Sequence, residues 1–400
     1  MYDDLATPPA GIQEWPASTS VIAASNQGAL VEALRQRGAL SKMQLSELTG
    51  LSAATVNRVL KGLIEHGFVA QAGTEESTGG RPAVLFDVVP TALVSGAVQV
   101  RREGITGALV GFNGEIIERF EQEFDAPGPD GGPRALHRMI ARLAERCTAL
   151  DIPLHVVGVS VGGIASPNGT VTGLNPRYWP EATLTELVGE HEVRVVVEND
   201  ANALALGELY RGVGRFSRQF VALVLDRGLG SGIVANGELV RGARFAAGEV
   251  GYLLIDSDSL TTPPQGRGEL ESKIDPVAVT GAAHDVGIDA AHPLTAAEIV
   301  ARESAGDQRA APVASMVLDM LARGVAALVS ILDPDVVVLG EGLDERADLV
   351  IPGLRKRLEG RIQFVPEIRT ASLGADAVLL GVAETALRAV PGPVRISRSV

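Results

Sequence analysis

The fold of the N-terminal region follows from residues 41–67, which read SKMQLSELTGLSAATVNRVLKGLIEHG. Ser41 and Gln44 have the spacing of a capping box, in which each side chain bonds the backbone N–H of the other residue. Ser52 is placed to cap a second helix, and Gly67 can end that helix in the left-handed conformation. This stretch therefore predicts two short helices joined by a tight turn.

The second helix has one apolar face and one face suited to DNA. Its apolar residues recur at the spacing of a single buried stripe and are Val56, Val59, Leu60, Leu63 and Ile64. The other face carries Ala53, Ala54, Thr55, Asn57, Arg58 and Lys61. Small residues allow close approach to a groove, Asn and Arg can bond base edges, and Lys neutralises phosphate. Including a residue of the preceding helix and one of the loop described next, we predict DNA contacts from Lys42, Ala53, Thr55, Asn57, Arg58, Lys61 and Arg81.

A wing is expected after these helices. Strands are predicted at Val69–Ala72 and Ala83–Val89, joined by a loop that ends Gly79-Gly80-Arg81-Pro82. A flexible loop that carries one arginine suits insertion into a narrow minor groove. The alternative is an ordinary three-helix module with a solvated polar face. The two caps, the turn and Arg81 together favour a winged helix-turn-helix.

Composition limits the classes of function. The 400 residues suggest two or three domains, and the net charge of −14 argues against broad affinity for nucleic acid. Residues 26–87 contain six Lys or Arg and six Asp or Glu, so DNA contact must come from a few placed cations. The chain has a single cysteine, Cys147, so it cannot form a disulfide framework. We expect Cys147 to be a core residue on the apolar face of a helix. We find no signal peptide and no apolar run near the ~18 residues of a membrane span, so the cytoplasm is the expected location.

The rest of the chain predicts an α/β body. Strands are expected at 93–100, 104–110, 116–124, 155–160, 193–197, 220–225, 232–235 and 336–339, with helices between several of them. This alternation in both halves indicates mixed sheets. The expected organisation is a disordered tail at 1–25, a winged helix-turn-helix at 26–89, a two-lobed body at 90–390 and a C-terminal tail at 391–400.

The chain from about Asn26 to Val390 resembles the ROK family, named for its repressors, open reading frames and kinases. The most specific motifs are Gly79–Pro82, Glu198–Asn202, Gly248–Gly251 and Leu332–Asp335. The resemblance implies an actin-like, ribonuclease-H-like pair of lobes with a sugar in the cleft between them. It also implies that a winged helix-turn-helix marks the repressor branch.

Two features of the family's kinases are missing. Their first phosphate loop, Asp-x-Gly-Gly-Thr, is replaced here at the aligned residues Gln99, Arg101, Arg102 and Glu103. Glycines let the backbone approach phosphate and the Asp holds magnesium, so this replacement removes both features. Asp226-Arg227 stands where the family has Gly-Thr in the second loop, and a carboxylate there would repel a nucleotide. We therefore expect no catalytic residues and no kinase activity.

The family's zinc site is not expected either. The resemblance assigns its His position to Tyr252 and its three Cys positions to Thr262, Pro264 and Glu269. Structural zinc needs four competent ligands, and this set does not supply them. We expect no metal and no cofactor.

The sugar-facing positions mostly match the family. The resemblance puts Gly163, Asn175, Asn199, Asp200, Glu249 and Glu271 around a sugar. Carboxylates and amides suit this role because each can hold two hydroxyl groups. The alternative for Asn199 and Asp200 is simple capping of a helix, which is compatible with sugar contact. Tyr252, in place of a histidine that touches the sugar, leaves the identity of the sugar open.

Three functions from different classes remain open at this point. The first is a sugar-responsive DNA-binding regulator, expected to act as a repressor on a double-stranded operator as a homodimer or homotetramer, with no membrane partner. The second is an active sugar kinase, and the third a regulator without a small-molecule effector. Arg101 and Arg102 raise the further question of whether the effector carries a phosphate. The alternative for these two arginines is pairing with Glu103 and Asp226.

Overall fold

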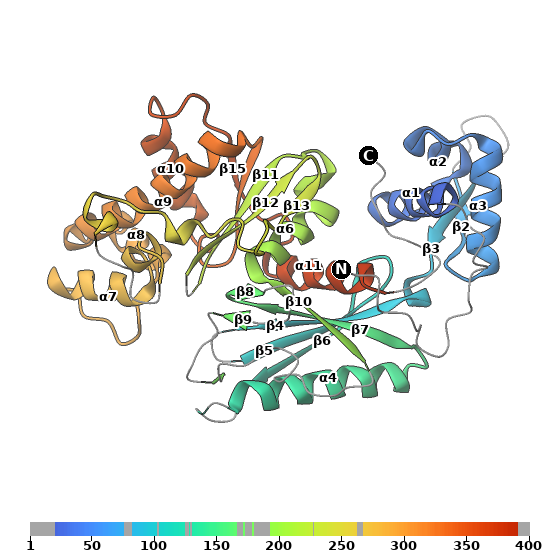
Figure 1. Ribbon diagram of the computed structural model, residues 1–400, viewed down its shortest axis with the longest axis horizontal. Helices are drawn as coiled ribbons and strands as arrows, with labels where there is room; N and C mark the ends of the chain where they lie inside the picture. Colours follow the sequence, from blue (N-terminus) through green and yellow to red (C-terminus); the bar gives the residue numbers. More distant parts are fainter. Residues whose placement is uncertain are drawn as a thin grey trace.

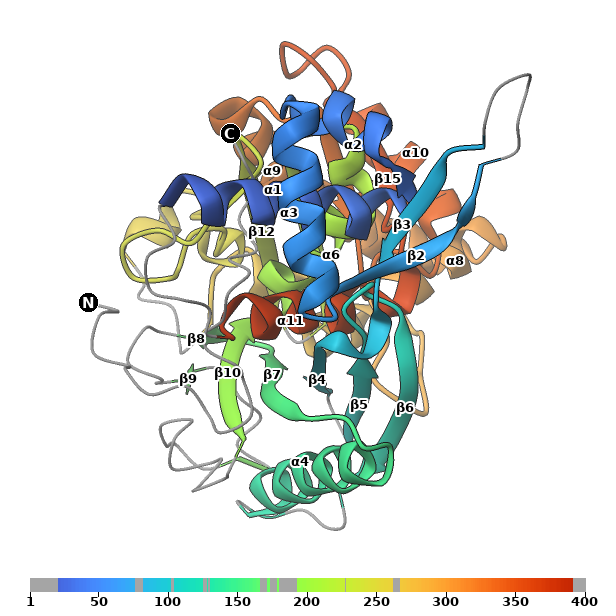
Figure 2. The same cartoon turned by 90° about the vertical axis from the view of Figure 1, so that its right-hand side faces the viewer.

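The DNA-binding module is a small bundle of helices against a three-stranded sheet. The computed structural model describes residues 21–75, 82–101, 104–124, 128, 130–165, 171–172, 178–179, 193–226, 228–261 and 267–390. The module contains α1 (Val21–Arg37), β1 (Leu40–Ser41), α2 (Lys42–Thr49), α3 (Ala53–Glu65), β2 (Val69–Thr74) and β3 (Val84–Val88). The strands pair antiparallel in the order β1-β3-β2, and β2 and β3 extend away from the helices as the wing (Figure 2).

The predicted caps of the module are confirmed. Ser41 and Gln44 form the capping box of α2, and the Ser52 side chain accepts a hydrogen bond from the Thr55 N–H at the start of α3. Gly67 has φ 75°, and its N–H donates to the Ile64 carbonyl at 3.0 Å while the Phe68 N–H donates to the Leu63 carbonyl at 2.9 Å. These two bonds make a Schellman motif, so the chain turns sharply from the helix into the wing.

Two details of the module differ from the sequence predictions. Helix α1 begins at Val21, inside the predicted tail at residues 1–25, because residues 21–25 contain no Gly or Pro and continue the helical run. Ile64, predicted on the buried face of α3, is 41% exposed. The buried face of α3 ends at Leu63, and Ile64, the next residue, lies at the surface.

The first lobe of the body is a mixed sheet between two helices. Its strands are β4 (Val94–Val100), β5 (Gly104–Val110), β6 (Ile116–Glu123), β7 (Leu154–Val161) and β10 (Arg194–Asn199), in the order β10-β7-β4-β5-β6. Helix α4 (Gly131–Ala149) covers one face and α11 (Ala377–Arg388) the other (Figure 1). Cys147 lies in the core beneath α4, as expected. A short pair, β8 (Ile164–Ala165) with β9 (Val171–Thr172), follows β7.

The second lobe repeats this plan. Its strands are β11 (Phe220–Leu225), β12 (Leu229–Ala235), β13 (Glu238–Val240), β14 (Val336–Leu339) and β15 (Glu367–Thr370), in the order β13-β12-β11-β14-β15. Its helices are α7 (Pro276–Asp285), α8 (Ala296–Ser304), α9 (Ala311–Leu332) and α10 (Ala347–Leu358). Helix α6 (Asp200–Arg211) covers the remaining face, so that α6 and α11 lie between the two sheets (Figure 1).

One helix bears on the prediction that the chain has no apolar run long enough to span a membrane. Residues Gln308–Leu332 are long and apolar enough to cross a membrane by length and composition, contrary to the prediction that no such run exists. In the structure 44% of that apolar window is buried, and Val313, Val317, Leu321 and Val325 belong to the core of the second lobe. The apolar run is thus explained by a helix that covers a sheet.

The DNA-binding module shares its core with the body. Phe112, in the turn between β5 and β6, is fully buried among the core residues of the module. Its ring centroid lies 5.9 Å from that of Phe68, and the Arg35 guanidinium lies 5.4 Å from the Phe112 ring. The predicted boundary near residue 90 therefore separates two parts of the chain that pack against each other directly.

Candidate DNA interface and inter-lobe carboxylate site

The predicted DNA-facing side chains of α3 point away from the core. Ala53, Asn57, Arg58 and Lys61 are exposed and Thr55 is half-buried. The buried residues of the same helix are Val56, Val59, Leu60 and Leu63. One face of α3 is therefore free to enter a groove, with the wing beside it (Figure 2).

Local contacts already hold part of this polar face. Lys42 donates to Asn57 Oδ1 at 2.6 Å, and Asn57 Nδ2 donates to the Ala53 carbonyl at 2.9 Å. Lys61 pairs with Glu65 at 3.7 Å, a surface pair of small energetic value. Arg58 has neither a hydrogen bond nor an ion pair with any residue that the structure describes. Base contact by Asn57 requires rearrangement of the Lys42 bond, whereas Arg58 is available as it stands.

Strand ends of the two sheets carry the predicted sugar-binding residue Asn199 and two acidic residues that were not predicted to bind the sugar. Asn199 ends β10, and Asp226 and Glu341 follow β11 and β14. The carboxyl ends of parallel strands are the usual place for ligands in α/β sheets. A hydrogen bond joins the two sheets here, since Gln99 Nε2 at the end of β4 donates to Glu341 Oε2 at 2.9 Å.

Asn199 both caps α6 and contacts the first lobe. Its Oδ1 accepts from the Asn202 N–H at 3.0 Å, and its Nδ2 donates to the Gly163 carbonyl at 2.8 Å. Gly163 has φ 143°, a conformation that a side chain would strain. The structure shows the cap, and sugar contact stays a prediction.

Glu271 is held by backbone groups of the second lobe. Its Oε2 accepts from the Leu229 N–H at 3.1 Å, and its Oε1 accepts from the Gly268 N–H at 2.9 Å. A Cβ on Gly228 or on Gly251 would lie 2.5 Å from Glu271 Oε2, so both glycines make room for this carboxylate. Each oxygen of Glu271 keeps one further lone pair for a ligand hydroxyl.

Burial, and after it neighbouring carboxylates, raise the pKa of Asp200, Glu249 and Glu341. Burial, and after it the charges of Asp226, Glu341 and Glu249, raise the pKa of Asp200 to about 7, while a backbone bond from Ala201 opposes the shift. Burial and then Glu271 raise the pKa of Glu249. Burial and then Asp226 raise the pKa of Glu341, against the charge of Arg101. We call Asp200, Asp226, Glu249, Glu271 and Glu341 the inter-lobe carboxylate site. Buried carboxyl groups crowded by like charges are more common at functional sites than in stabilising ion pairs.

Some predicted residues lie outside the described residues. These are Arg81, Asn175, Arg102, Glu103, Arg227, Thr262 and Pro264. Of the remaining positions assigned to lost zinc ligands, Tyr252 is exposed and Glu269 is half-buried. Among the described residues, no group of three His, Cys, Asp or Glu side chains is arranged to hold a metal.

A second contact between the lobes was not predicted from the sequence. Glu198 is 3% exposed at the end of β10, and Arg241, after β13 of the other lobe, donates to its Oε2 at 2.6 Å. Asn202 Nδ2 donates to Glu198 Oε1 at 3.1 Å. The one sequence signal for this contact is the position of Glu198 beside Asn199 and Asp200. Its partner Arg241 is 43 residues away and cannot be found from local sequence.

The comparisons with known proteins agree with this architecture. The ROK family model matches residues 95–389, and a model described as the IclR helix-turn-helix domain matches residues 28–73. The chain belongs to the ROK family. Its N-terminal module is a winged helix-turn-helix and its body is the two-lobed, actin-like ROK domain, as the sequence predicted.

Relatives of this ROK chain include both repressors and kinases. It is 24% identical to a xylose repressor from Bacillus spizizenii, over 89% of this chain and 93% of that protein. It is 29% identical to a glucokinase from Thermotoga maritima, over 69% of this chain and 91% of the kinase. A crystal structure of a ROK family transcriptional regulator, described as a homolog of the E. coli MLC protein, superposes with a TM-score of 0.73 at 20% identity. That superposition covers 90% of this chain and 95% of the regulator.

Arg58→Ala should weaken binding to a cognate DNA site by about 1–3 kcal/mol, because the free guanidinium on α3 is placed to bond a base edge. Titration of the variant against cognate and random duplexes measures the effect. The matched control is Arg355→Ala, an exposed arginine on α10 far from the module. Equal losses on both duplexes would make Arg58 a phosphate contact instead.

Asp200→Asn should stabilise the protein, and the gain should grow with pH. The pKa of Asp200 is about 7 in the folded chain, against about 3.9 for an unperturbed Asp. The folded state therefore holds an extra proton between these values, so the free energy of unfolding falls as the pH rises through that window.

The gain from Asp200→Asn should be about 1–3 kcal/mol larger near pH 8 than near pH 5 in denaturant unfolding. Asp289→Asn, whose side chain is 92% exposed, is the control. A gain independent of pH would show that the Asp200 carboxyl titrates alike in the folded and unfolded chains.

Proposed function

We propose that this protein is a sugar-responsive repressor that binds operator DNA through α3 and the wing. The observation that carries the proposal is the combination in one chain of an exposed α3 face with the inter-lobe carboxylate site. Relatives named xylose repressors span most of the chain, which supports the same assignment. We further propose that it works in the cytoplasm, where an operator is accessible, as a homodimer or homotetramer on a pseudo-palindromic site.

We propose that Gly163, Asn199, Asp200, Glu249 and Glu271 hold the effector, together with Asn175. Hydroxyl groups can donate to the free lone pairs of Asp200, Glu249 and Glu271, and Asn199 and Gly163 offer backbone and amide groups beside them. A sugar is the ligand class that presents several donors on a small rigid ring.

The effector should be an uncharged sugar rather than a sugar phosphate. Among the described residues, the inter-lobe carboxylate site has five carboxyl groups, and Arg101 is a cation whose charge lowers the pKa of Glu341. A phosphate dianion in this field would be repelled, and binding it would require neutralisation of several carboxylates.

A kinase is the second candidate, because a glucokinase is among the relatives. Asp226 and Glu341 argue against it, since they lie at the strand ends where a nucleotide phosphate would have to approach. Gln99 donates a hydrogen bond to Glu341, whereas the Asp at the aligned position of the kinases holds magnesium. We propose that the chain is not an enzyme.

The test uses a duplex selected by the protein from a random-sequence pool. Xylose, glucose and their phosphates are titrated into the complex, and the affinity for DNA is measured. We expect an uncharged sugar to change that affinity by about 5–150-fold and the matching phosphate to have little effect. Glu249→Gln should reduce the response, whereas the exposed Glu303→Gln on α8 should not.

Two outcomes would contradict the proposal. If no sugar alters the affinity for DNA, the protein is a regulator without a sugar effector. If ADP appears from ATP in the presence of a hexose, the protein is a kinase.

A further inference from the structure

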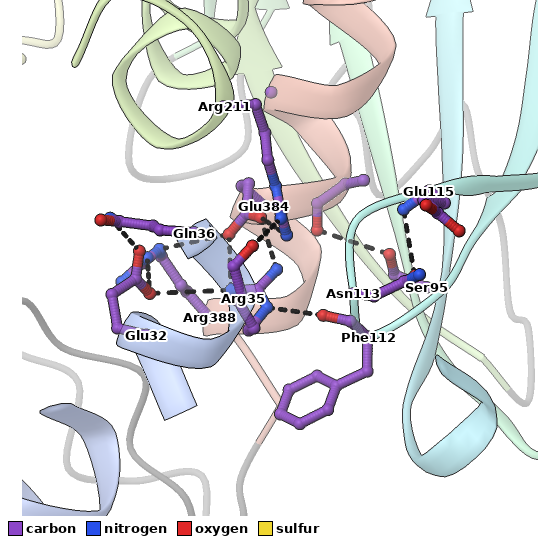
Figure 3. Close-up of polar contacts among 12 residues, drawn as sticks. Glu32, Arg35, Gln36, Ser95, Phe112, Asn113, Glu115, Arg211, Glu384 and Arg388 are labelled. Atoms are coloured by element: carbon purple, nitrogen blue, oxygen red, sulfur yellow. Dashed lines mark hydrogen bonds and ion pairs between the residues drawn. The ribbon is translucent and has the colours of Figure 1, made fainter. Parts of the chain in front are cut away.

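A cluster of five charged side chains joins the DNA-binding module to the body. Figure 3 shows Glu32 and Arg35 of α1, Arg211 at the end of α6, and Glu384 and Arg388 of α11 converging beside Phe112. The side chains of Arg35 and Glu384 are 1% and 2% exposed. We call these five residues the junction cluster.

Arg35 is the residue through which the module is fixed. Its Nη1 and Nη2 donate to the two oxygens of Glu384 at 3.2 and 2.5 Å, and its Nε donates to the Phe112 carbonyl at 2.6 Å. The guanidinium thus contacts α11 of the body and the β5–β6 turn at once. Because the carboxylate pairing is bidentate, it fixes direction as well as distance.

Arg211 connects α6 to the same cluster. Its Nη1 donates to the Arg35 carbonyl at 2.6 Å and its Nη2 to Glu384 Oε1 at 3.2 Å. A Cβ on Gly114 would lie 2.1 Å from the Arg211 guanidinium carbon, so the β5–β6 turn also closes over Arg211. The last residue of α6 therefore holds the backbone of α1.

The other end of α6 lies in the inter-lobe carboxylate site. The helix begins at Asp200, with Asn199 as its cap, and runs 12 residues to Arg211. At 1.5 Å per residue it is a rod of roughly 18 Å. A displacement of its first turn by a ligand is carried to Arg211, because a hydrogen-bonded helix does not shorten.

The packing of α6 makes it sensitive to the angle between the lobes. It follows β10 of the first lobe, yet a Cβ on Gly232 of β12 in the second lobe would lie 2.2 Å from the Ala201 carbonyl. Against α11 it packs backbone to backbone, since a Cβ on Gly381 would meet the Ala203 carbonyl at 1.7 Å. Rotation of one sheet against the other must therefore shift α6 along or across α11.

One donor of the junction cluster is available for another arrangement. Arg211 Nε is buried without a hydrogen-bond partner among the described residues. The pair between Arg388 Nε and Glu384 Oε2 is 3.8 Å long, and Arg388 also lies 3.8 Å from the Tyr210 ring centroid. Arginines that compete for Glu384 can exchange partners when α6 moves.

We propose that Arg211 is a positioning residue that transmits the state of the inter-lobe carboxylate site to α1, and through α1 to the DNA-binding helix. This inference rests on the sugar response proposed above. Movement of Arg211 shifts the carbonyl of Arg35 and reorients the module, which changes the spacing of the two DNA-binding helices in an oligomer.

The test compares Arg211→Gln with wild type for three quantities: sugar affinity, DNA affinity, and the change in DNA affinity that the sugar causes. We expect the sugar-induced change to fall to about twofold or less, with sugar affinity itself nearly unchanged. Arg211→Lys keeps one donor and the charge, and should restore part of the response. Arg146→Gln, which breaks a half-exposed pair with Glu118 on the far side of the first lobe, is the matched control.

A second readout needs only DNA. Amide hydrogen exchange is measured with and without the selected duplex. In wild type, DNA should alter exchange in residues 200–211 as well as in the module, and in Arg211→Gln the change should be confined to the module. If Arg211→Gln does not fold, Arg211→Lys is compared with wild type in the same way and should weaken the change in α6.

The outcomes separate this inference from the proposed function. An unchanged sugar response in a folded Arg211→Gln, or an exchange pattern in α6 that DNA does not alter in wild type, overturns the role of Arg211. A wild type that responds to DNA in α6 but to no sugar overturns the effector proposal and leaves the connection through Arg211 intact.

Discussion

The ion pair between Arg35 and Glu384 determines how the DNA-binding module sits on the body. Burial alone would raise the pKa of Glu384, yet Arg35, Arg211 and Arg388 together lower it to about 2, so the carboxylate is charged at any physiological pH. Removing one partner of such a buried pair typically costs about 3–5 kcal/mol, because it leaves the other charge unpaired. The module is therefore a docked part of the structure and not a domain on a free linker.

This docking changes what the body can do for DNA binding. A tethered module would be indifferent to the angle between the lobes, whereas a docked one is moved by it. Phe112 adds an apolar contact to the ionic one, since a residue of the first lobe completes the core of the module. Helices α6 and α11 then link that core to the strand ends where the carboxylates gather. Gln99 and Asp226, which differ from the residues of the family's kinases, are the basis of the proposal that the body senses a ligand without transforming it.

The local features of the fold could be predicted from the sequence. The caps at Ser41 and Ser52, the turn at Gly67 and the strand-to-helix step at Asn199 depend on neighbours three or four residues away. The arrangement of the body as two lobes was implied by the resemblance to the ROK family, because hydrophobic periodicity alone does not determine how strands are divided between sheets. The start of α1 was placed too late because residues 21–25 continue its helical run. Ile64 was misjudged because the edge of a buried stripe depends on packing.

The contacts that matter most for coupling could not be predicted. Arg35 and Glu384 are 349 residues apart, and nothing in either local pattern indicates the other. Glu198 and Arg241 are a similar case on the other side of α6. The location of Asp200, Glu249 and Glu271 in one site was implied by resemblance, whereas the crowding of their charges became visible only when Glu341 and Asp226 were placed beside them.

We propose that sugar and DNA act on one equilibrium between two arrangements of this protein. Linkage then requires that each ligand change the affinity of the other by the same factor. The most direct measurement is calorimetric titration of the active sugar into the free protein and into the saturated DNA complex. We predict that the two sugar affinities differ by the factor by which that sugar changes the affinity for DNA. Equal sugar affinities for the free and the DNA-bound protein would contradict the account.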